Sequence, residues 1–598
     1  MKEKRHNASM LITGAFFTAL LLYWGLVYPE HLVQKEQMQL FLLSPTYLKE
    51  HLIIQGGLVR YLGEFLTQFF LYKWVAAAIV SGILLSLFTA TNRVLRKLFG
   101  KPHTLLAVIP AVGYHFLLLD DYYYLAGALA LSLTTWAVSE IIGIREPKRR
   151  LKTTLLTIPF IYWMLGGTYL VFILSVSLAE WILFFKDDSR KMNKQQIVWA
   201  IPTLLIVGGI IPLIARNYVI LDTLLQSYLS HSYYKFSFIL PSPLIWVFLA
   251  LPLVILLQWA FQSFYPGKSH PVFRYAVTTV LLITIGFGLY YVPDFKEEKE
   301  MKYDNLVCRQ QWEQIVELAR QEPPVGEQGK LALTLALGQT GRLNSQLFQF
   351  NPGLHDFFIA YQVQGMAPLM AQEPYFYLGL TNFSQMLCIE TIESTPDAAH
   401  PVRAMKRYAE NCLINGQYDV AARYLRYLRQ TLFYRNWANH AMQYLHNDDK
   451  ILSHPLWGKL KTYRVKDDFY FQFDQPETML VALLRSNLKN QMAYEFLISR
   501  SLLQMDFDEF LKYLPLASQM NYSELPLTYQ EALAYVETLL PEIPENLAHY
   551  SISEPVRSRL TAYAQTFRQG GHKEPQLMQK LYGDTYWYYV HFRGNDEN

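Results

Sequence analysis

The stretch WVAAAIVSGILLSLFTA, from Trp74 to Ala90, decides the fold of this chain. It contains no charged residue, and a helix of about 20 apolar residues is long enough to cross a bilayer. Basic residues follow it directly, namely Arg93, Arg96, Lys97 and Lys101. Lysine and arginine gather in the cytoplasmic loops of membrane proteins. The stretch therefore predicts a transmembrane helix whose C-terminal end faces the cytoplasm.

Comparable apolar segments occur on both sides of this stretch. They are Met10–Tyr28, Leu105–Leu119, Tyr122–Ile142, Thr154–Leu165, Tyr169–Phe185, Ile197–Ala215, Pro243–Phe261 and Tyr275–Val292. Together they predict about nine crossings, of which Leu105–Leu119 and Thr154–Leu165 are short for a span. Basic residues fall on every second connection, in the groups Arg145 to Lys152, Lys186 to Lys194, and Lys268 with Arg274. This pattern places the N-terminus in the cytoplasm.

The composition predicts two structural units. Hydrophobic residues make up 52% of the 598 residues and charged residues 17%, but charges recur every few residues only after Lys296. We expect a transmembrane unit over residues 1–293 and a soluble helical unit over 294–598, in an all-α chain. An odd number of crossings puts the second unit outside the cytoplasm, which is the periplasm if the membrane is a bacterial inner membrane. The net charge of +4 is small and scattered, and gives no reason to expect a nucleic-acid partner.

The first external loop, residues 29–73, is long for a connector. Its apolar residues recur at helical spacing and predict two amphipathic helices at the interface, broken at Gly56 and Gly57. Packing against neighbouring helices without a further function is the alternative.

The C-terminal half contains paired helical patterns. The clearest is AMKRYAENCLINGQYDVAARYLRYLR, from Ala404 to Arg429, with a turn at Asn415 to Tyr418. It resembles a tetratricopeptide (TPR) repeat, which implies a TPR-like domain that binds a protein partner. A helical cover for the membrane half is the alternative. The three cysteines, Cys308, Cys388 and Cys412, are compatible with one disulfide or with buried thiols.

Charged residues beside the external ends of the spans are the candidate functional residues. Asp120 and Asp121 fill a tight external turn, where two carboxylates could hold a divalent metal or form a solvated turn. A glutamate of the first loop could act as a general base. Arg60, Arg216 and Lys235 are placed to meet a lipid phosphate or to anchor headgroups.

The layout of the first 300 residues or so resembles the GT-C glycosyltransferases, which transfer sugars from lipid-linked phosphate donors on the external face. The shared features are the cytoplasmic N-terminus, the long acidic first loop, the acidic pair in the next external turn and the short central crossings. The resemblance implies Glu36 as the base, Asp120 and Asp121 as metal or acceptor ligands and Arg216 as a phosphate clamp. A polyprenyl-phosphate sugar is then the expected donor. The acids of the first loop stand singly, unlike the acidic dyad of many such enzymes.

The segments EQMQLFLLSPTYL (36–48), GGLVRYLGEFLTQFF (56–70) and ENCLINGQYDVAARYL (410–425) look like those of an uncharacterised bacterial family. That family consists of multi-spanning membrane proteins with TPR-like C-termini, and the resemblance implies a fold without an activity. The sequence thus supports a GT-C-like transferase first, and a membrane-anchored scaffold for envelope proteins second. A transporter is third, because few charges lie within the spans.

Overall fold

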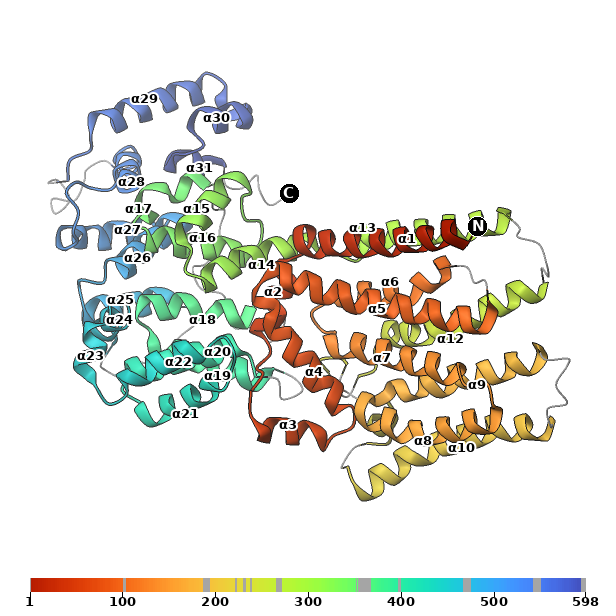
Figure 1. Ribbon diagram of the computed structural model, residues 1–598. Coiled ribbons are helices and arrows are strands. Elements are labelled where there is room, and N and C mark those ends of the chain that lie inside the picture. Colours follow the sequence, from red (N-terminus) through yellow and green to blue (C-terminus); the bar gives the residue numbers. More distant parts are fainter. Residues whose placement is uncertain are drawn as a thin grey trace. The chain divides into compact units, whose positions relative to one another are not determined.

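The computed structural model of the chain is helical (Figure 1). It describes residues 2–100, 104–186, 194–220, 223–229, 233–236, 239–264, 271–350, 352, 367–395, 400–465, 475–540 and 550–592. Within these ranges there is no strand, and one isolated antiparallel bridge joins Tyr123 to Tyr234. The chain divides into two compact units: Met1–Phe295 with Thr395–Val402 and Tyr427–Arg435, and the remaining residues from Lys296 onward.

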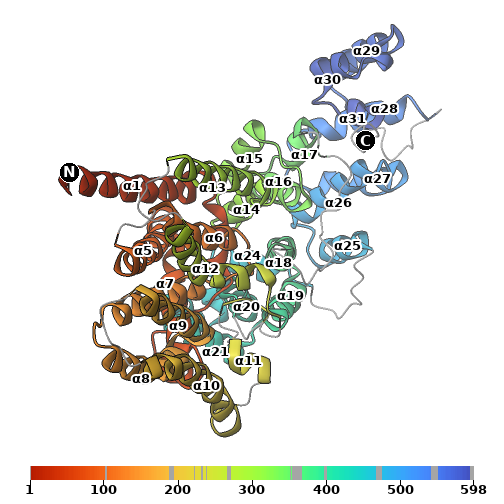
Figure 2. The same ribbon diagram turned by 90° about the vertical axis from the view of Figure 1, so that its right-hand side faces the viewer.

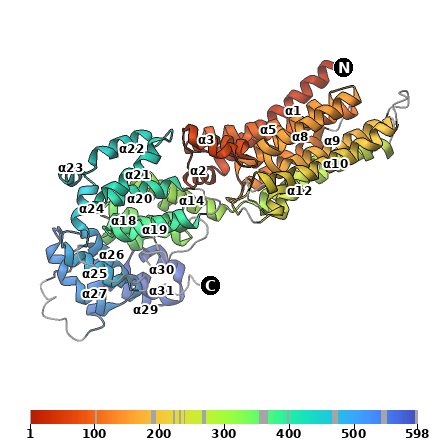
Figure 3. The ribbon, with the colours of Figure 1, turned by 90° about the horizontal axis from the view of Figure 1, so that it is seen from below.

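The first unit contains the apolar helices. Its elements are α1 (Lys2–Leu22), η1 (Tyr23–Val27), α2 (Glu30–Gln37), α3 (Pro45–Leu52), α4 (Gly57–Thr67), η2 (Gln68–Leu71), α5 (Lys73–Phe99), η3 (Thr104–Val108), α6 (Ile109–Leu118), α7 (Leu125–Ile142), α8 (Pro147–Leu165), η4 (Gly166–Thr168), α9 (Tyr169–Lys186), α10 (Lys194–Tyr218), α11 (Leu224–Leu229), α12 (Ser242–Phe264) and α13 (Pro271–Tyr291). Figure 2 shows α5, α7 and α9 in a row, and Figures 1 and 3 show α8, α9 and α10 running side by side. Each apolar segment expected from the sequence coincides with helical structure.

The described residues support fewer membrane spans than the sequence predicts. Among them, five helical stretches are long and apolar enough to cross a membrane, or up to seven if two bent pairs count as single spans. The expected segments Thr154–Leu165 and Tyr169–Phe185 fall within one such stretch, Pro147–Phe184. The expected Leu105–Leu119 coincides with a shorter apolar helix, Thr104–Leu118. By length and composition, the described residues thus support five to seven candidate spans, and not clearly nine.

Charges gather at one end of these helices. At the C-terminal ends of α5 and α7, Arg93 Nη2 lies 2.9 Å from Glu140 Oε1, and Lys97 Nζ donates to the carbonyl of Ser139 at 2.7 Å. Arg150, expected in a solvated basic connection, is instead buried, and its guanidinium binds both carboxylate oxygens of buried Glu180. Other basic residues expected in connections, Lys101, Arg190, Lys191 and Lys268, lie outside the described residues.

The first loop folds as three short α-helices and a 3-10 turn, one helix more than expected. The predicted break is present: Gly56 has φ +72° and α4 begins at Gly57. A side chain at Gly57 would collide with the carbonyl oxygen of His51, so the chain can reverse this closely only with glycine there. Ser44 caps the N-terminus of α3 by accepting a hydrogen bond from the Tyr47 amide.

The second unit contains short helices, several of which contact the next helix along the chain. Its elements are α14 (Phe295–Cys308), α15 (Trp312–Gln321), α16 (Glu327–Gln339), α17 (Leu343–Gln346), η5 (Leu347–Phe350), α18 (Ala367–Leu378), α19 (Thr381–Ser394), α20 (Val402–Asn415), α21 (Tyr418–Arg429), α22 (Arg435–Ala441), η6 (Met442–Tyr444), α23 (Asp448–Ser453), α24 (Trp457–Tyr463), α25 (Pro476–Ser486), α26 (Gln491–Gln504), α27 (Phe507–Tyr513), η7 (Leu514–Gln519), α28 (Leu527–Glu537), α29 (Glu554–Arg568), η9 (Gly571–Lys573), α30 (Pro575–Tyr582) and α31 (Tyr586–Phe592). The predicted turn after Asn415 is confirmed, because Gly416 has φ +78° between α20 and α21. The rings of Tyr408 and Tyr424 pack between these two helices.

Three carboxylates and two arginines form a buried ionic cluster in the second unit. Arg403 Nη1 donates to Asp304 at 2.6 Å, and Arg407 donates to Glu373 at 2.7 Å and to Glu410 at 2.5 Å. The Arg407 guanidinium also lies 3.7 Å from the centroid of the Phe376 ring. The cluster ties α14, α18 and α20 together. Breaking such a network leaves a buried charge without a partner, which is strongly destabilising.

The three cysteines, all within the described residues, are free thiols. Cys388 and Cys412 are buried, and Cys388 Sγ lies 2.8 Å from Gln372 Oε1. The sequence allows one disulfide or buried thiols, and the structure contains thiols without a disulfide.

We predict that Arg407→Met destabilises the second unit by about 3–5 kcal/mol, because Glu373 and Glu410 lose a buried cation. The measurement is thermal unfolding of the detergent-solubilised chain, followed with a thiol-reactive fluorophore that reports exposure of Cys388 and Cys412. The matched control is Arg423→Met, whose arginine is exposed on α21 and should stay within about 0.5 kcal/mol of wild type. Equal unfolding temperatures for both variants would show that the cluster does not hold the unit together.

Candidate functional site

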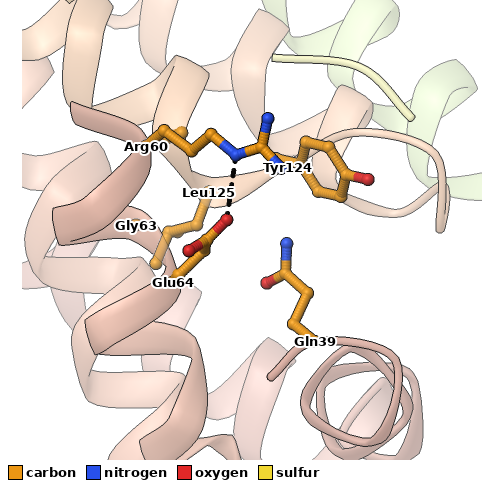
Figure 4. A pocket seen from close by; sticks show the side chains of 7 residues that line it. Gln39, Arg60, Gly63, Glu64, Tyr124 and Leu125 are labelled. Carbon is orange, nitrogen blue, oxygen red and sulfur yellow. Dashed lines mark hydrogen bonds and ion pairs between the residues drawn. The ribbon is translucent and has the colours of Figure 1, made fainter. Parts of the chain in front are cut away.

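A small open hollow, with a cavity volume of about 10 Å³, lies in the first unit beside the first loop (Figure 4). Its lining consists of Gln39, Arg60, Gly63, Glu64, Tyr124, Leu125 and Ala126. These residues come from the segment after α2, from α4 and from the start of α7. The lining is mixed, with a guanidinium, a carboxylate, an amide and a phenol among apolar groups.

The local sequence explains how α4 forms one wall. Arg60 and Glu64 are four residues apart, so they lie on the same face of the helix. A side chain at Gly63 would come within 2.9 Å of the Ala126 amide nitrogen. Glycine at this position therefore lets α4 approach the first turn of α7, which brings Arg60 and Glu64 next to Tyr124.

Glu64 is the centre of a hydrogen-bonded network. Its Oε1 accepts from Arg60 Nε at 3.0 Å, and its Oε2 accepts from the Tyr47 hydroxyl at 2.5 Å and lies 3.0 Å from His51 Nε2. Burial alone would raise the pKa of Glu64, but the hydrogen bond from His51 and the charge of Arg60 outweigh burial. The net result is a pKa below the ordinary value of 4.5, so Glu64 is ionised at neutral pH.

His51 also contacts this network. Its Nδ1 lies 2.9 Å from the carbonyl oxygen of Tyr47, while its Nε2 faces the Glu64 carboxylate. Both of these partners are hydrogen-bond acceptors.

The acidic pair expected at the next external turn forms a second cluster. Asp120 accepts a hydrogen bond from the Tyr122 amide at 2.8 Å, and Asp121 Oδ1 lies 3.3 Å from His31 Nδ1. Lys35 Nζ donates to the main-chain oxygens of Asp120 and Tyr123 at 2.8 and 2.9 Å. Burial raises the pKa of Asp120. Basic residues thus surround the turn and hold it in place.

Lys235 belongs to this second cluster. Its amide donates to the Tyr122 carbonyl at 2.8 Å, and its Nζ lies 5.4 Å from the centroid of the Tyr122 ring. Burial lowers the pKa of Lys235, although the charges of Asp121 and Asp120 act in the opposite direction. In the part of the chain that the structure describes, no group of three or more His, Cys, Asp or Glu side chains is placed to hold a metal ion.

The remaining candidates lie elsewhere. Glu36, the expected base, is buried on α2, and both of its carboxylate oxygens accept from the Tyr434 hydroxyl, at 3.0 and 3.2 Å. Arg216 is exposed in the last turn of α10. Neither residue lines the hollow. The structure thus brings Arg60 to the hollow, places Lys235 beside Asp120 and Asp121, and keeps Glu36 and Arg216 apart from that lining.

Sequence reasoning missed Glu64, His51 and Tyr47. The available signal was the spacing of Arg60 and Glu64 on a helix that starts after a glycine pair. His51 and Tyr47 carry no comparable signal, because they reach Glu64 only after the chain reverses at Gly56.

A protein-family model matches residues 4–593, and its description is "Family of unknown function (DUF6057)". The match extends over nearly the whole chain, which agrees with the resemblance to an uncharacterised family. No curated protein and no solved structure matches the chain.

We predict that Glu64→Gln destabilises the first unit by about 1.5–3 kcal/mol near neutral pH, because it removes hydrogen bonds to a charged acceptor. A lowered pKa means that the contribution of Glu64 is complete above its ordinary value of 4.5 and disappears as the pH falls through the folded value. The free energies of unfolding of the variant and of wild type should therefore become equal in acid. Thermal unfolding at several pH values tests this, with Glu50→Gln on the exposed face of α3 as control. A difference that stays constant in acid would contradict the assignment of charge to Glu64.

Proposed function

Because the chain belongs to the DUF6057 family, whose function is unknown, we propose its function from its own residues: a membrane-embedded, GT-C-like glycosyltransferase. Its donor is a sugar on a lipid phosphate, and transfer takes place on the non-cytoplasmic face. The observation that carries the proposal is the ion pair of Arg60 and Glu64, which faces the hollow from the first loop.

Arg60 is the proposed phosphate ligand. Its Nε is held by Glu64, which fixes the plane of the guanidinium, and Figure 4 shows this group beside Tyr124 with the Gln39 amide across the hollow. Arginine binds phosphate oxygens through paired N–H groups when its head is held in one orientation. The charge of the Arg60 guanidinium favours the phosphate over neutral headgroups.

Glu64 takes the role of base that the sequence assigned to Glu36. The acceptor hydroxyl would give its proton to Glu64 while its oxygen forms a bond to the anomeric carbon of the sugar. The bond from that carbon to the phosphate oxygen breaks, and the lipid phosphate leaves against Arg60. The lowered pKa keeps Glu64 ready to accept a proton but makes it a weak base. A ligand pocket usually measures about 300–1,000 Å³, whereas the hollow has a cavity volume of about 10 Å³, room for about one water molecule. Donor binding must therefore open the first loop away from α7.

The charge distribution supports a non-cytoplasmic hollow. The hollow lies at the start of α7, whereas the paired charges of Arg93, Lys97 and Glu140 lie at its other end. The 18 residues of α7 separate these ends by about 27 Å, close to the thickness of the hydrocarbon layer. If the basic end faces the cytoplasm, as basic ends do, the hollow opens on the opposite side. If the number of crossings is odd, as the sequence predicts, the C-terminal unit lies in the periplasm of a double-membraned bacterium.

A membrane-anchored scaffold is the second candidate. It is favoured by contacts that stabilise the fold. The Glu36 carboxylate accepts from the Tyr434 hydroxyl, Asp121 lies beside His31, and the Asp120 carboxylate accepts from the Tyr122 amide. In this alternative the helix pairs of the second unit form a TPR-like surface that assembles envelope proteins.

We predict that Arg60→Met weakens binding of a polyprenyl phosphate by about 10- to 100-fold, because a charge-assisted contact contributes about 1.5–3 kcal/mol. The measurement is titration of that lipid into the chain in nanodiscs, at matched amounts of folded protein. The control is Arg145→Met, which removes an exposed charge at the other end of the helices. Glu64→Gln should retain binding but lose sugar transfer to envelope glycans in cells.

Two outcomes would contradict the transferase. If Arg60→Met and Arg145→Met bound the lipid with equal affinity, Arg60 would not be the phosphate ligand. Normal envelope glycans in Glu64→Gln cells, together with a defect when the second unit is deleted, would favour the scaffold.

A further inference from the structure

The start of α5 marks one boundary of the membrane. This helix has 27 residues and is one of the five stretches that can cross alone, and its first residue is Lys73. Tyr72 and Trp74 on either side are about half exposed, at 54% and 45%. Aromatic and basic residues at the end of an apolar helix are typical of the headgroup region.

Residues Tyr427–Arg435 lie at this same boundary, although they are more than 350 positions later in the sequence. They belong to the first compact unit. The ring of Phe433 packs edge-on against Phe69 and Tyr72, with centroids 5.6 and 5.7 Å apart. The Leu43 amide donates to the Gln430 carbonyl at 2.8 Å, and the Tyr434 hydroxyl binds Glu36. A residue this close to Tyr72 must be at the depth of the lipid headgroups.

The turn in this segment directs one apolar side chain outwards. Thr431 is buried, donates to the Leu428 carbonyl at 2.7 Å and accepts from the Tyr434 amide at 3.1 Å. Phe433 and Tyr434 pack onto the first loop as described above. Leu432 between them is 41% exposed. A leucine that points outwards at the depth of the headgroups is expected to contact lipid.

The charge of the segment is uniformly positive. The sequence YLRQTLFYR contains two arginines and no acid. Arg429 and Arg435 are both exposed, and Arg435 Nε donates to the Arg429 carbonyl at 3.1 Å, which places the Arg435 side chain beside the backbone of Arg429. Lys73 adds a third exposed positive charge at the same boundary.

We propose that Tyr427–Arg435 is a second membrane contact of the chain, one that lies on the bilayer rather than crossing it. Leu432 enters the headgroup region, and Arg429 and Arg435 bind the phosphates of anionic phospholipids. This contact fixes the first loop, and with it α2, against the membrane surface. It does not depend on the proposed transfer reaction.

The test places an environment-sensitive fluorophore at Leu432→Cys in the full chain, reconstituted in vesicles. Cys308→Ser removes the partly exposed thiol, and buried Cys388 and Cys412 do not react. The matched control is Leu577→Cys on α30, whose leucine is equally exposed at 41%. We expect blue-shifted emission at residue 432 and quenching by headgroup-labelled lipid at a depth of roughly 5–10 Å, and neither effect at residue 577. Equal emission and quenching at both positions would overturn the proposal.

The second part of the test varies the lipid charge. Each arginine near an anionic surface should contribute about fivefold to the bound population, so the label should respond to phosphatidylglycerol in a phosphatidylcholine vesicle. Arg429→Gln with Arg435→Gln should abolish that response, whereas Arg568→Gln with Lys580→Gln, two exposed positions of the second unit, should retain it. If the label still responds to phosphatidylglycerol in the variant with Arg429→Gln and Arg435→Gln, anionic lipid is not the partner. The same holds if the emission of the label is equal in vesicles with and without phosphatidylglycerol.

Discussion

The exclusion of unpaired charge from hydrocarbon is the constraint on which the rest of this structure depends. Between Lys73 and Arg93, α5 carries no charged side chain, so its charges lie at its two ends. At one end, Arg93 and Lys97 meet Glu140. Arg150 and Glu180 are buried among the helices, and two hydrogen bonds join their side chains. The polar chemistry of the first unit is thereby confined to the opposite end, around the first loop.

At that end, hydrogen bonds and ion pairs join polar residues from separate parts of the first unit. Glu64 collects three donors from α3 and α4, and the turn at Asp120 and Asp121 is held by Lys35 and His31 from α2. These contacts leave an arginine held rigidly at a hollow, which is a geometry suited to phosphate. They also explain why an acid that looks catalytic in the sequence, such as Glu36, can serve instead to fix the first loop.

The second unit also pairs its buried charges with one another. Arg403 and Arg407 lie among Asp304, Glu373 and Glu410 in an interior that excludes water. Such a network contributes less to net stability than its short distances imply, because burying each charge is costly. Its effect is to allow one register of α14, α18 and α20, since any other register leaves a charge unpaired.

The helical class, the apolar helices and the turns at Gly56 and Gly416 follow from the sequence, because each depends on residues within a few positions of one another. The sequence also offered Arg60, Asp120 and Lys235 as candidate site residues. Only the tertiary structure decided which of them meet. Tyr434 reaches Glu36 across 398 positions and Arg403 reaches Asp304 across 99, and no local pattern encodes such a pairing. The number of spans also depends on tertiary structure, because apolar composition alone does not specify whether successive apolar helices continue, bend or reverse in space.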